Sequence, residues 1–514
     1  METQFAKKMG KVALTLVLSL VLFSLSSCAK KSESFNNTTS IEKGRNHDHL
    51  VMALPVDPDG LDPQRTAAAS TFQITSNIYE TLISVDESGN IIPSLADSWT
   101  VSDDGTEITF TLREGAKFSD GTVCDSQKVK ESFARLMDAQ SPRGSYYSGI
   151  NKITCQDDRT VTFHYSTLDV SALQNFAYSW AAIVDASKGD NLRSKPLGTG
   201  AYKLSSWIAQ QNIILVKNEY YPGEVGINKV EFVIMPDASS QISSFNNKDI
   251  DIMIITGDQL PALGDKSNYN LIEGTINGLQ LMAMNLKNEA LSDLRVRQAI
   301  NYAVDKEALI EAVWWGYGKE IGSHYPVVLP EYVDHTGTYA YNIEKAKELL
   351  KEAGYENGLT LRLALPKSYQ EYVNAGIVIA DDLKKVGINC SVEIVEWSDW
   401  LENVYTGRKY DLTVVGHTGR LDPYALLKRY ESSAGENYFN YSNNRVDEIL
   451  HVYNTIASDS ERLALVQEIQ NILAHEVPAL YIQDPIQLYI TQTDVEGFKT
   501  YPIELYNMKA VKFK

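Results

Sequence analysis

A short apolar segment near the N-terminus constrains the fold most, because it decides in which compartment the chain folds. The run VALTLVLSLVLF at residues 12–23 follows Lys7, Lys8 and Lys11. That run is too short for an ordinary membrane-spanning helix, and a positive leader before a short apolar run is typical of a secretory signal. We therefore expect residues 1–27 to be removed and the remainder to fold outside the cytoplasm.

The residues that follow the run resemble a bacterial lipoprotein signal, with Leu25, Ser26 and Ser27 before Cys28. Cleavage there leaves Cys28 as a lipidated first residue, and this implies a membrane anchor. Residues 28–47 are polar and predict a flexible tether. The alternative of an uncleaved anchor is weaker because no hydrophobic flank follows. The histidines of the HDH stretch at residues 47–49 are interpreted as chance members of a linker, with metal contact as the alternative.

Charge and cysteine content narrow the function classes. The 514 residues carry a formal charge of -19, and removal of residues 1–27, which contribute +2, leaves -21. Such an acidic surface repels nucleic acid and anionic lipid, so no nucleic-acid partner is expected. Cys124, Cys155 and Cys390 show no CxxC spacing. They are interpreted as small buried side chains, and a Cys124–Cys155 bridge remains open outside the cytoplasm.

Local patterns predict a mixture of strands and helices. About 480 residues after the leader exceed one hydrophobic core, so two or three domains are expected. Alternating polar and apolar residues predict four strands, and helical spacing with buried stripes predicts three helices. The strands are expected at 107–113, 160–165, 229–235 and 359–365, and the helices at 293–303, 343–354 and 460–474. His164 is expected to lie on the face of a strand. The mixture indicates α/β or α+β domains.

The usual signatures of a secreted hydrolase are absent from the sequence. There is no G-x-S-x-G elbow, no H-E-x-x-H helix and no Walker loop. His475 and Glu476 begin HEVPA, which lacks the second histidine, and GYGKEIG at residues 316–322 has the wrong glycine spacing for a dinucleotide site. A triad with distant members stays open. The pattern favours a protein that is not an enzyme and has no cofactor.

Several longer stretches resemble one family in its own order. They are LDPQ (61–64), NIYETL (77–82), IIPSLADSWTVSDDGTEITFTLREGAKFSDG (91–121), PLGTGAY (196–202), DIDIM (249–253), DLRVRQAINYAVDKEALI (293–310) and the YDL to LDP segment (410–423). The chain thereby resembles the family 5 extracellular solute-binding proteins, which are the oligopeptide-, dipeptide- and nickel-binding components of ABC importers.

The resemblance implies a bilobed fold of the type II periplasmic binding proteins, with three domains and a hinge of two crossing strands. Lobe I would combine 48–85, 196–285 and 492–514, the inserted domain would be 86–195, and lobe II would be 286–491. The ligand would be enclosed between the lobes by hinge closure. The implied partners are a membrane permease and its ATPase, and the implied state is a monomer.

The GHTGRLDP stretch at residues 416–423 is the most informative candidate site. Peptide-binding relatives carry there an aspartate that holds the peptide's amino terminus, whereas this chain has Gly419 or Arg420. A buried ammonium without a counter-charge costs several kcal/mol. Arg420 instead suits a carboxylate, which a guanidinium binds with two parallel hydrogen bonds. The plainer interpretation is a surface turn whose arginine pairs with a nearby acid.

Other candidate residues follow from the same resemblance. Gly416 and Thr418 belong to the same stretch, and His417 stands where peptide-binding relatives often have a tryptophan, so it would donate a hydrogen bond or complete a metal's shell. Trp397 matches a tryptophan that walls a side-chain pocket. Tyr178 and Trp180 fall near where nickel-binding relatives place an arginine that this chain lacks.

The sequence therefore predicts a binding protein for a peptide or a small carboxylate-bearing solute. The alternative within the family is a nickel or metallophore chelate. Outside the family, the alternatives are a tethered hydrolase and a ligand sensor. A core position is an equally good interpretation of Trp397.

Overall fold

The protein is described by a computed structural model that covers residues 47–275, 277–418 and 420–514. One compact unit begins at His47. The lipobox with Cys28, the tether before His47, and Gly419 lie outside the described residues, so the predictions made for them stay predictions. No helix within the described ranges is long and apolar enough to cross a membrane.

A twelve-stranded mixed sheet forms the centre of this unit, in the order β16-β15-β17-β13-β18-β11-β1-β10-β9-β8, with β12 and β14 also paired to β18. Its strands are β1 (His49–Leu54), β8 (Tyr202–Ile208), β9 (Asn212–Lys217), β10 (Lys229–Ile234), β11 (Ile252–Ile255), β12 (Tyr269–Thr275), β13 (Gly278–Met284), β14 (Gly318–Glu320), β15 (Leu359–Pro366), β16 (Ile388–Val395), β17 (Leu412–Thr418) and β18 (Ala479–Gln492). β1 pairs in parallel with β10 and β15 with β16, while β13 runs antiparallel to both β17 and β18.

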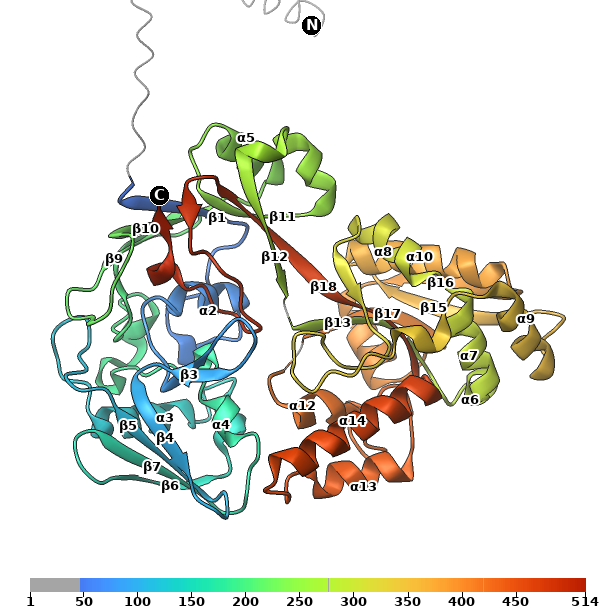
Figure 1. Cartoon of the computed structure of the whole chain (residues 1–514), viewed down its shortest axis with the longest axis horizontal. Helices are drawn as coiled ribbons and strands as arrows, with labels where there is room; N and C mark the ends of the chain where they lie inside the picture. Colours follow the sequence, from blue (N-terminus) through green and yellow to red (C-terminus); the bar gives the residue numbers. More distant parts are fainter. Residues whose placement is uncertain (1–46, 276, 419) are drawn as a thin grey trace, which may run out of the picture. The chain divides into compact units, whose positions relative to one another are not determined.

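Strand β18 connects the two ends of this sheet. Residues 479–485 pair with β13 and β14, and residues 486–492 pair with β12 and β11. The ribbon in Figure 1 shows β18 extending from the strands β13 and β17 to β11 and β12. A second connection between the two ends of the sheet is the step from β12, which pairs with the second half of β18, to β13, which pairs with its first half. These two connections are where a hinge is expected, and the domain bounds given above stay a prediction.

Three smaller sheets complete the strands. A four-stranded antiparallel sheet has the order β4-β5-β7-β6, and two pairs are β2 with β3 and β19 with β20. The bounds are β2 (Ile83–Val85), β3 (Ile91–Pro93), β4 (Ala96–Val101), β5 (Glu107–Leu112), β6 (Ile150–Cys155), β7 (Thr160–Tyr165), β19 (Val495–Glu496) and β20 (Lys512–Phe513). All four predicted strands are confirmed as β5, β7, β10 and β15. His164 lies on β7 and contacts Glu107 at 3.0 Å and Thr154 at 2.8 Å, as expected for a strand-face histidine.

Helices pack beside the sheets. They are α2 (Ala69–Thr75), α3 (Ser126–Leu136), α4 (Ala172–Asn175), α5 (Ala238–Asn246), α6 (Glu289–Ser292), α7 (Leu294–Ala303), α8 (Lys306–Trp314), α9 (Ile343–Glu352), α10 (Gln370–Lys384), α11 (Trp397–Asp399), α12 (Pro423–Leu427), α13 (Asn444–Tyr453) and α14 (Asp459–Glu476). The three predicted helices are confirmed as α7, α9 and α14. Asp293, Asn342 and Ser458 cap their first turns by accepting backbone N–H bonds.

The described cysteines do not form a bridge. Cys124, Cys155 and Cys390 are free thiols, so the Cys124–Cys155 alternative is wrong. Cys124 is buried, as expected, while the other two are half-buried. Burial raises the pKa of Cys390 to about 11, which keeps this thiol protonated at neutral pH.

Histidines at the start of the described chain are structural. The ring of His47 stacks on Phe513 and lies near Asp494, and His49 in β1 contacts Glu231 at 2.9 Å. Within the described ranges no three His, Cys, Asp or Glu side chains gather in a way that could hold a metal ion. His49 belongs to β1, so the interpretation of this histidine as part of a linker is wrong, and the expectation that neither histidine contacts a metal stays a prediction.

The PLGTGAY stretch holds two backbone segments in close contact. Gly200 donates a backbone hydrogen bond to the Ile78 carbonyl at 2.9 Å, and Tyr202 donates one to Asn77 at 3.0 Å. A Cβ added at Gly200 would lie 2.6 Å from the Asn77 oxygen and 2.6 Å from the Ile78 carbonyl carbon. A side chain at Gly200 therefore requires the two segments to separate.

We expect Gly200→Ala to lower the free energy of unfolding by about 1–3 kcal/mol, the usual cost of overpacking a tight contact. Gly337→Ala is the matched control because a Cβ there would meet no heavy atom within 4 Å. Thermal unfolding of both variants checks the prediction. Equal midpoints for the two variants would contradict it.

Candidate functional site

A cleft of about 420 Å³ lies where β13, β17 and β18 meet the C-terminal segment 500–506. We call it the main cleft. Its other walls come from the start of α2, from Tyr178, and from Tyr369 and Tyr372 near the start of α10. It is lined by Ala69, Gln73, Tyr178, Thr275, Gly278, Leu279, Gln280, Tyr369, Tyr372, Trp397, Val415, Gly416, His417, Thr418, Arg420, Pro485, Gln487, Tyr489, Thr500, Tyr501, Pro502, Ile503, Glu504, Leu505 and Tyr506.

The end of β17 forms one wall of the main cleft. Gly416, His417 and Thr418 are its last residues, and His417 and Thr418 stand opposite Leu279 and Gly278 of β13. A Cβ at Gly416 would lie 2.1 Å from the Tyr372 hydroxyl oxygen. Glycine at this position therefore lets Tyr372 approach the strand. The sequence prediction placed these three residues together, and the structure brings all three to the cleft.

Arg420 also lines the main cleft and is half-buried. Its Cζ lies 5.7 Å from the centre of the Tyr146 ring, a cation–π contact that supports the guanidinium from one side. With the described residues the guanidinium forms neither an ion pair nor a hydrogen bond. A surface turn whose arginine pairs with a nearby acid is therefore not what the described residues form.

Tyr178 and Trp180 occupy different positions. Tyr178 lines the main cleft, and its hydroxyl accepts a hydrogen bond from the Leu421 N–H at 2.9 Å. Trp180 stacks behind Tyr178 with ring centres 4.2 Å apart, is 2% exposed, and is not among the lining residues. Arg143 covers its ring at 4.9 Å. Tyr178 is thus placed to contact a ligand, and Trp180 supports it.

His417 reaches from the cleft wall into a buried group of rings. Its Nε2 shares a hydrogen bond with the Tyr438 hydroxyl at 3.0 Å, and its ring centre lies 5.1 Å from that of His324. Burial, and then the charges of Arg429 and His324, hold the pKa of His417 well below its usual value. His417 is therefore neutral at pH 7, and it contributes a hydrogen-bonding ring and not a charge.

Trp397 lines the cleft at the start of α11. Its ring stacks on Trp400 at 4.9 Å and meets the edge of Tyr369 at 5.1 Å. The ring is half-buried, so it both packs against its neighbours and presents a face to the cleft.

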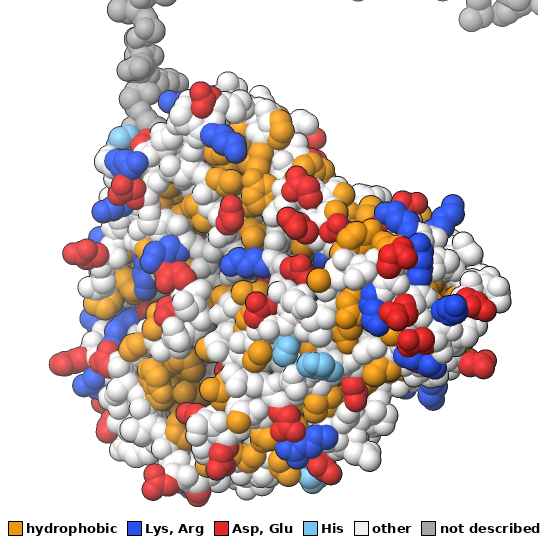
Figure 2. All heavy atoms as spheres, turned by 45° about the vertical axis from the view of Figure 1, so that its right-hand side comes forward, with side chains coloured by type: hydrophobic (Ala, Val, Ile, Leu, Met, Phe, Trp, Pro, Cys, Tyr) orange, Lys and Arg blue, Asp and Glu red, His pale blue; other side chains and the backbone are white. Residues whose placement is uncertain are grey.

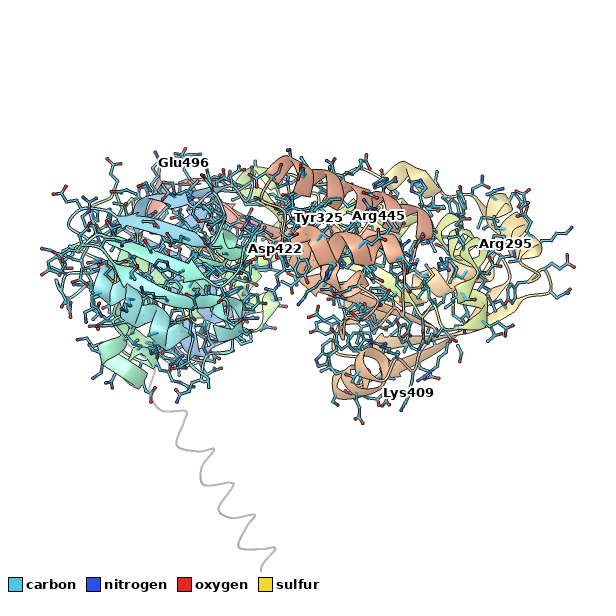
Figure 3. The ribbon with its side chains drawn as sticks, turned by 90° about the horizontal axis from the view of Figure 1, so that it is seen from below. Arg295, Tyr325, Lys409, Asp422, Arg445 and Glu496 are labelled. Carbon is cyan, nitrogen blue, oxygen red and sulfur yellow. The ribbon has the colours of Figure 1, made fainter. Side chains whose placement is uncertain are left out.

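Asp422, which is labelled in Figure 3, is a structural residue. It caps α12 by accepting the N–H groups of Tyr424 at 3.1 Å and Ala425 at 3.0 Å, and it accepts the Ser171 hydroxyl at 2.7 Å. Burial raises the pKa of Asp422, and these hydrogen bonds oppose the shift. These contacts give Asp422 a role in the structure of the turn that starts α12.

Glu504 is a cleft residue that the sequence prediction missed. It lies in the irregular segment between β19 and β20, and among the described lining residues it is the one carboxylate. The surrounding YPIELYN contains no motif, and neither periodicity nor spacing indicates a site there. Only the fold brings this segment opposite β17.

Two buried polar residues of β18, Gln483 and Asp484, directly precede the lining residue Pro485 in the sequence. Gln483 donates a hydrogen bond from Nε2 to Gln280 Oε1 at 2.6 Å, and both side chains are buried. Asp484 is 1% exposed and accepts the Val327 N–H at 2.8 Å. Burial raises the pKa of Asp484 to about 6, against the opposing effects of the N–H donors and Lys319.

Comparisons with known proteins agree on one family. The model of the bacterial extracellular solute-binding proteins, family 5 Middle, matches residues 90–438. The dipeptide-binding protein of Escherichia coli (strain K12) is 27% identical over 506 residues, which cover 90% of this chain and 94% of that protein.

Solved structures give the same result for the fold. The ABC transporter substrate-binding protein CtaP from Listeria monocytogenes matches with a TM-score of 0.82 and 23% identity, covering 90% of this chain and 99% of that one. The periplasmic binding protein DppA from Helicobacter pylori, in complex with the peptide STSA, matches with a TM-score of 0.71 and 26% identity over 90% and 98%. The predicted fold class is confirmed.

We expect Asp484→Asn to change how stability depends on pH. Below about pH 4 the carboxyl is protonated in both the folded and the unfolded wild type, so burial costs nothing. As pH rises to about 6 only the unfolded chain ionises readily, and above pH 6 the full cost of about 3 kcal/mol is present. The wild type should therefore lose stability relative to the variant between pH 4 and 6 and stay level above pH 7. Thermal midpoints measured across this range check it, and parallel profiles would contradict it.

Proposed function

Because the chain belongs to family 5 of the bacterial extracellular solute-binding proteins, we propose that it is the substrate-binding component of an ABC importer and captures a short peptide or a similar small carboxylate-bearing solute. Members of this family bind solutes outside the cytoplasm, so the chain is a binding protein and not an enzyme. The observation that carries the ligand class is Arg420, which lines the main cleft and whose guanidinium has no acidic partner among the described residues.

The geometry of the cleft supports a ligand anion at Arg420. A guanidinium binds a carboxylate with two parallel hydrogen bonds, and the contact of the Arg420 guanidinium with the Tyr146 ring uses none of its N–H groups in a hydrogen bond. The Tyr178, His417 and Trp397 side chains around it are neutral and largely aromatic. A cleft of about 420 Å³ lies within the usual range for small-molecule sites.

Two relatives support a peptide as the carboxylate-bearing solute. One is the dipeptide-binding protein of Escherichia coli, and the other is the Helicobacter pylori protein solved with the peptide STSA. We propose that the ligand is delivered to a permease and its ATPase, that the protein acts as a monomer, and that closure uses the two connections between the sheet's halves.

A small metal chelate is the second candidate, because His417 lies in the same cleft as Arg420. In the described ranges no three side chains could hold a bare metal ion. A metal would therefore arrive with its own organic ligands, its carboxylates would bind Arg420, and His417 would add one nitrogen. A metal isotope pattern in the bound ligand would favour this candidate.

We also propose that Cys28 is lipidated and holds the protein at the outer face of the cell membrane. The support is the sequence pattern of the leader and the polar tether after it. The surface drawn in Figure 2 carries acidic and basic side chains mixed with apolar ones, as for a body in water.

Native mass spectrometry of the processed protein, purified gently from membranes in detergent, tests the function. We expect masses spaced by amino-acid residues on the wild type, and at least a tenfold loss of affinity for the same ligands in Arg420→Ala, since a charged hydrogen-bonded contact is lost. Arg420→Lys should fall between them because it loses the two parallel bonds.

Lys152→Ala is the matched control, since Lys152 is an exposed cation on β6 and away from the cleft. Unchanged affinity in Arg420→Ala would remove the anion anchor. A single small adduct with a metal isotope pattern would replace peptides by a chelate.

We expect Cys28→Ala to move the protein from the membrane fraction into the soluble fraction or the medium, because one removable anchor is proposed. Fractionation followed by immunoblotting measures this, and Cys155→Ala serves as a cysteine control. Retention in the membrane fraction of a Cys28 variant from which residues 1–27 have been removed would contradict lipid anchoring.

A further inference from the structure

The main cleft carries two opposite charges on different walls. Arg420 follows β17, and Glu504 lies in the C-terminal segment 500–506. Among the described lining residues they are the only side chains that are charged at neutral pH, since burial keeps His417 neutral. The remaining walls are aromatic, apolar or uncharged polar.

Two consecutive residues, Tyr178 and Ser179, hydrogen-bond to the backbone beside both charges. The hydroxyl of Tyr178 accepts the N–H of Leu421, next to Arg420, at 2.9 Å. The hydroxyl of Ser179 donates to the carbonyl of Glu504 at 2.9 Å. Since consecutive Cα atoms are about 3.8 Å apart, these two bonds bring the two segments to the same part of the cleft.

Electrostatics agree with this placement. Burial raises the pKa of the Tyr178 phenol, and the charge of Arg420 opposes the shift while that of Glu504 adds to it. The Tyr178 ring is therefore within range of both charges.

Neither charge is neutralised by the described residues. Arg420 contacts the Tyr146 ring, and no ion pair or hydrogen bond joins the Glu504 carboxylate to the part of the chain that the structure describes. Asp422 nearby differs, because capping bonds and Ser171 occupy its oxygens. A half-buried residue that lines a cleft and whose carboxylate has no partner is suited to a cationic group of a ligand.

We propose that Glu504 binds the ammonium group of the ligand while Arg420 binds its carboxylate, so that the main cleft selects small zwitterions such as short peptides with both termini free. This inference rests on the proposed function and assigns the ligand's direction. The direction is the reverse of the one that the family resemblance implies, in which an acid in the stretch after β17 holds the amino terminus. A dianion would be repelled by Glu504 and a dication by Arg420.

The test combines changes in the ligand with changes in the protein. The four probes are synthetic mixtures of di- and tripeptides in free, N-acetylated, C-amidated and doubly capped forms. Retained ligand is first removed from the processed protein, and each probe is then titrated into it by calorimetry. We expect N-acetylation to weaken binding to the wild type by about tenfold or more, and to weaken binding to Glu504→Gln by less than about threefold. Amidation should weaken peptide binding to the wild type and to Glu504→Gln equally. In Arg420→Ala, acetylation should still weaken binding, whereas amidation should have little effect.

Glu114→Gln is the matched control, since it removes an exposed carboxylate outside the cleft. Thermal unfolding checks that each variant is folded. If Glu504→Gln unfolds, Glu504→Asp replaces it; this variant keeps the charge on a shorter side chain, so an acetylation penalty smaller than that of the wild type is expected.

Two failures can be told apart. If no free peptide binds the wild type, the proposal of a peptide ligand fails and this inference falls with it. A second outcome is that free peptides bind and that the loss of affinity on amidation requires Arg420, but that acetylation lowers the affinity of the wild type and of Glu504→Gln equally. The proposed function then stands and the assignment of Glu504 is overturned.

Discussion

Pairing along the whole length of β18 is the interaction on which the rest of the cleft depends. Its first half pairs with β13 and β14, and its second half with β12 and β11. Gln487 and Tyr489 on this strand line the cleft, and so does Pro485. Because each strand position fixes the face on which a side chain lies, the register of β18 also fixes what the ligand can contact.

Buried polar groups hold this register. Gln483 bonds Gln280 across the strand pair at 2.6 Å. A Cβ at Gly318 of β14, which pairs with Pro485, would lie only 1.4 Å from the Gln483 side-chain oxygen, so glycine at this position leaves room for the Gln483 amide. A hydrogen bond between two buried amides favours one alignment of the strands over its neighbours, because a slip would separate Gln483 Nε2 from Gln280 Oε1.

The sequence predicted much of the fold and part of the site. Alternation and helical spacing located β5, β7, β10, β15, α7, α9 and α14, since each buries a regular stripe. β18 was not predicted because its sequence, ALYIQDPIQLYITQ, shows no alternation of polar and apolar residues. The strand is buried on both faces over most of its length, and it contains a proline. The stretch 416–420 was found through resemblance, and its contact with the cleft follows from the pairing of β17 with β13. Whether Trp180 faces a ligand or a neighbour depends on the stacking of Tyr178 above it, which one sequence cannot show.

Two carboxylates near the same tyrosine illustrate why the ligand's direction had to come from the structure. In the sequence, Asp422 stands two residues from Arg420 and is the obvious candidate for an ammonium group, while Glu504 is far away in an unremarked segment. In the fold, Asp422 gives its oxygens to the first turn of α12 and to Ser171, and burial favours its neutral form. Glu504 lines the cleft, Ser179 binds only its backbone carbonyl, and its carboxylate has no hydrogen-bond or ion-pair partner among the described residues. The acid that can still exchange water for a ligand cation is the one whose hydrogen-bonding capacity the fold has not already used.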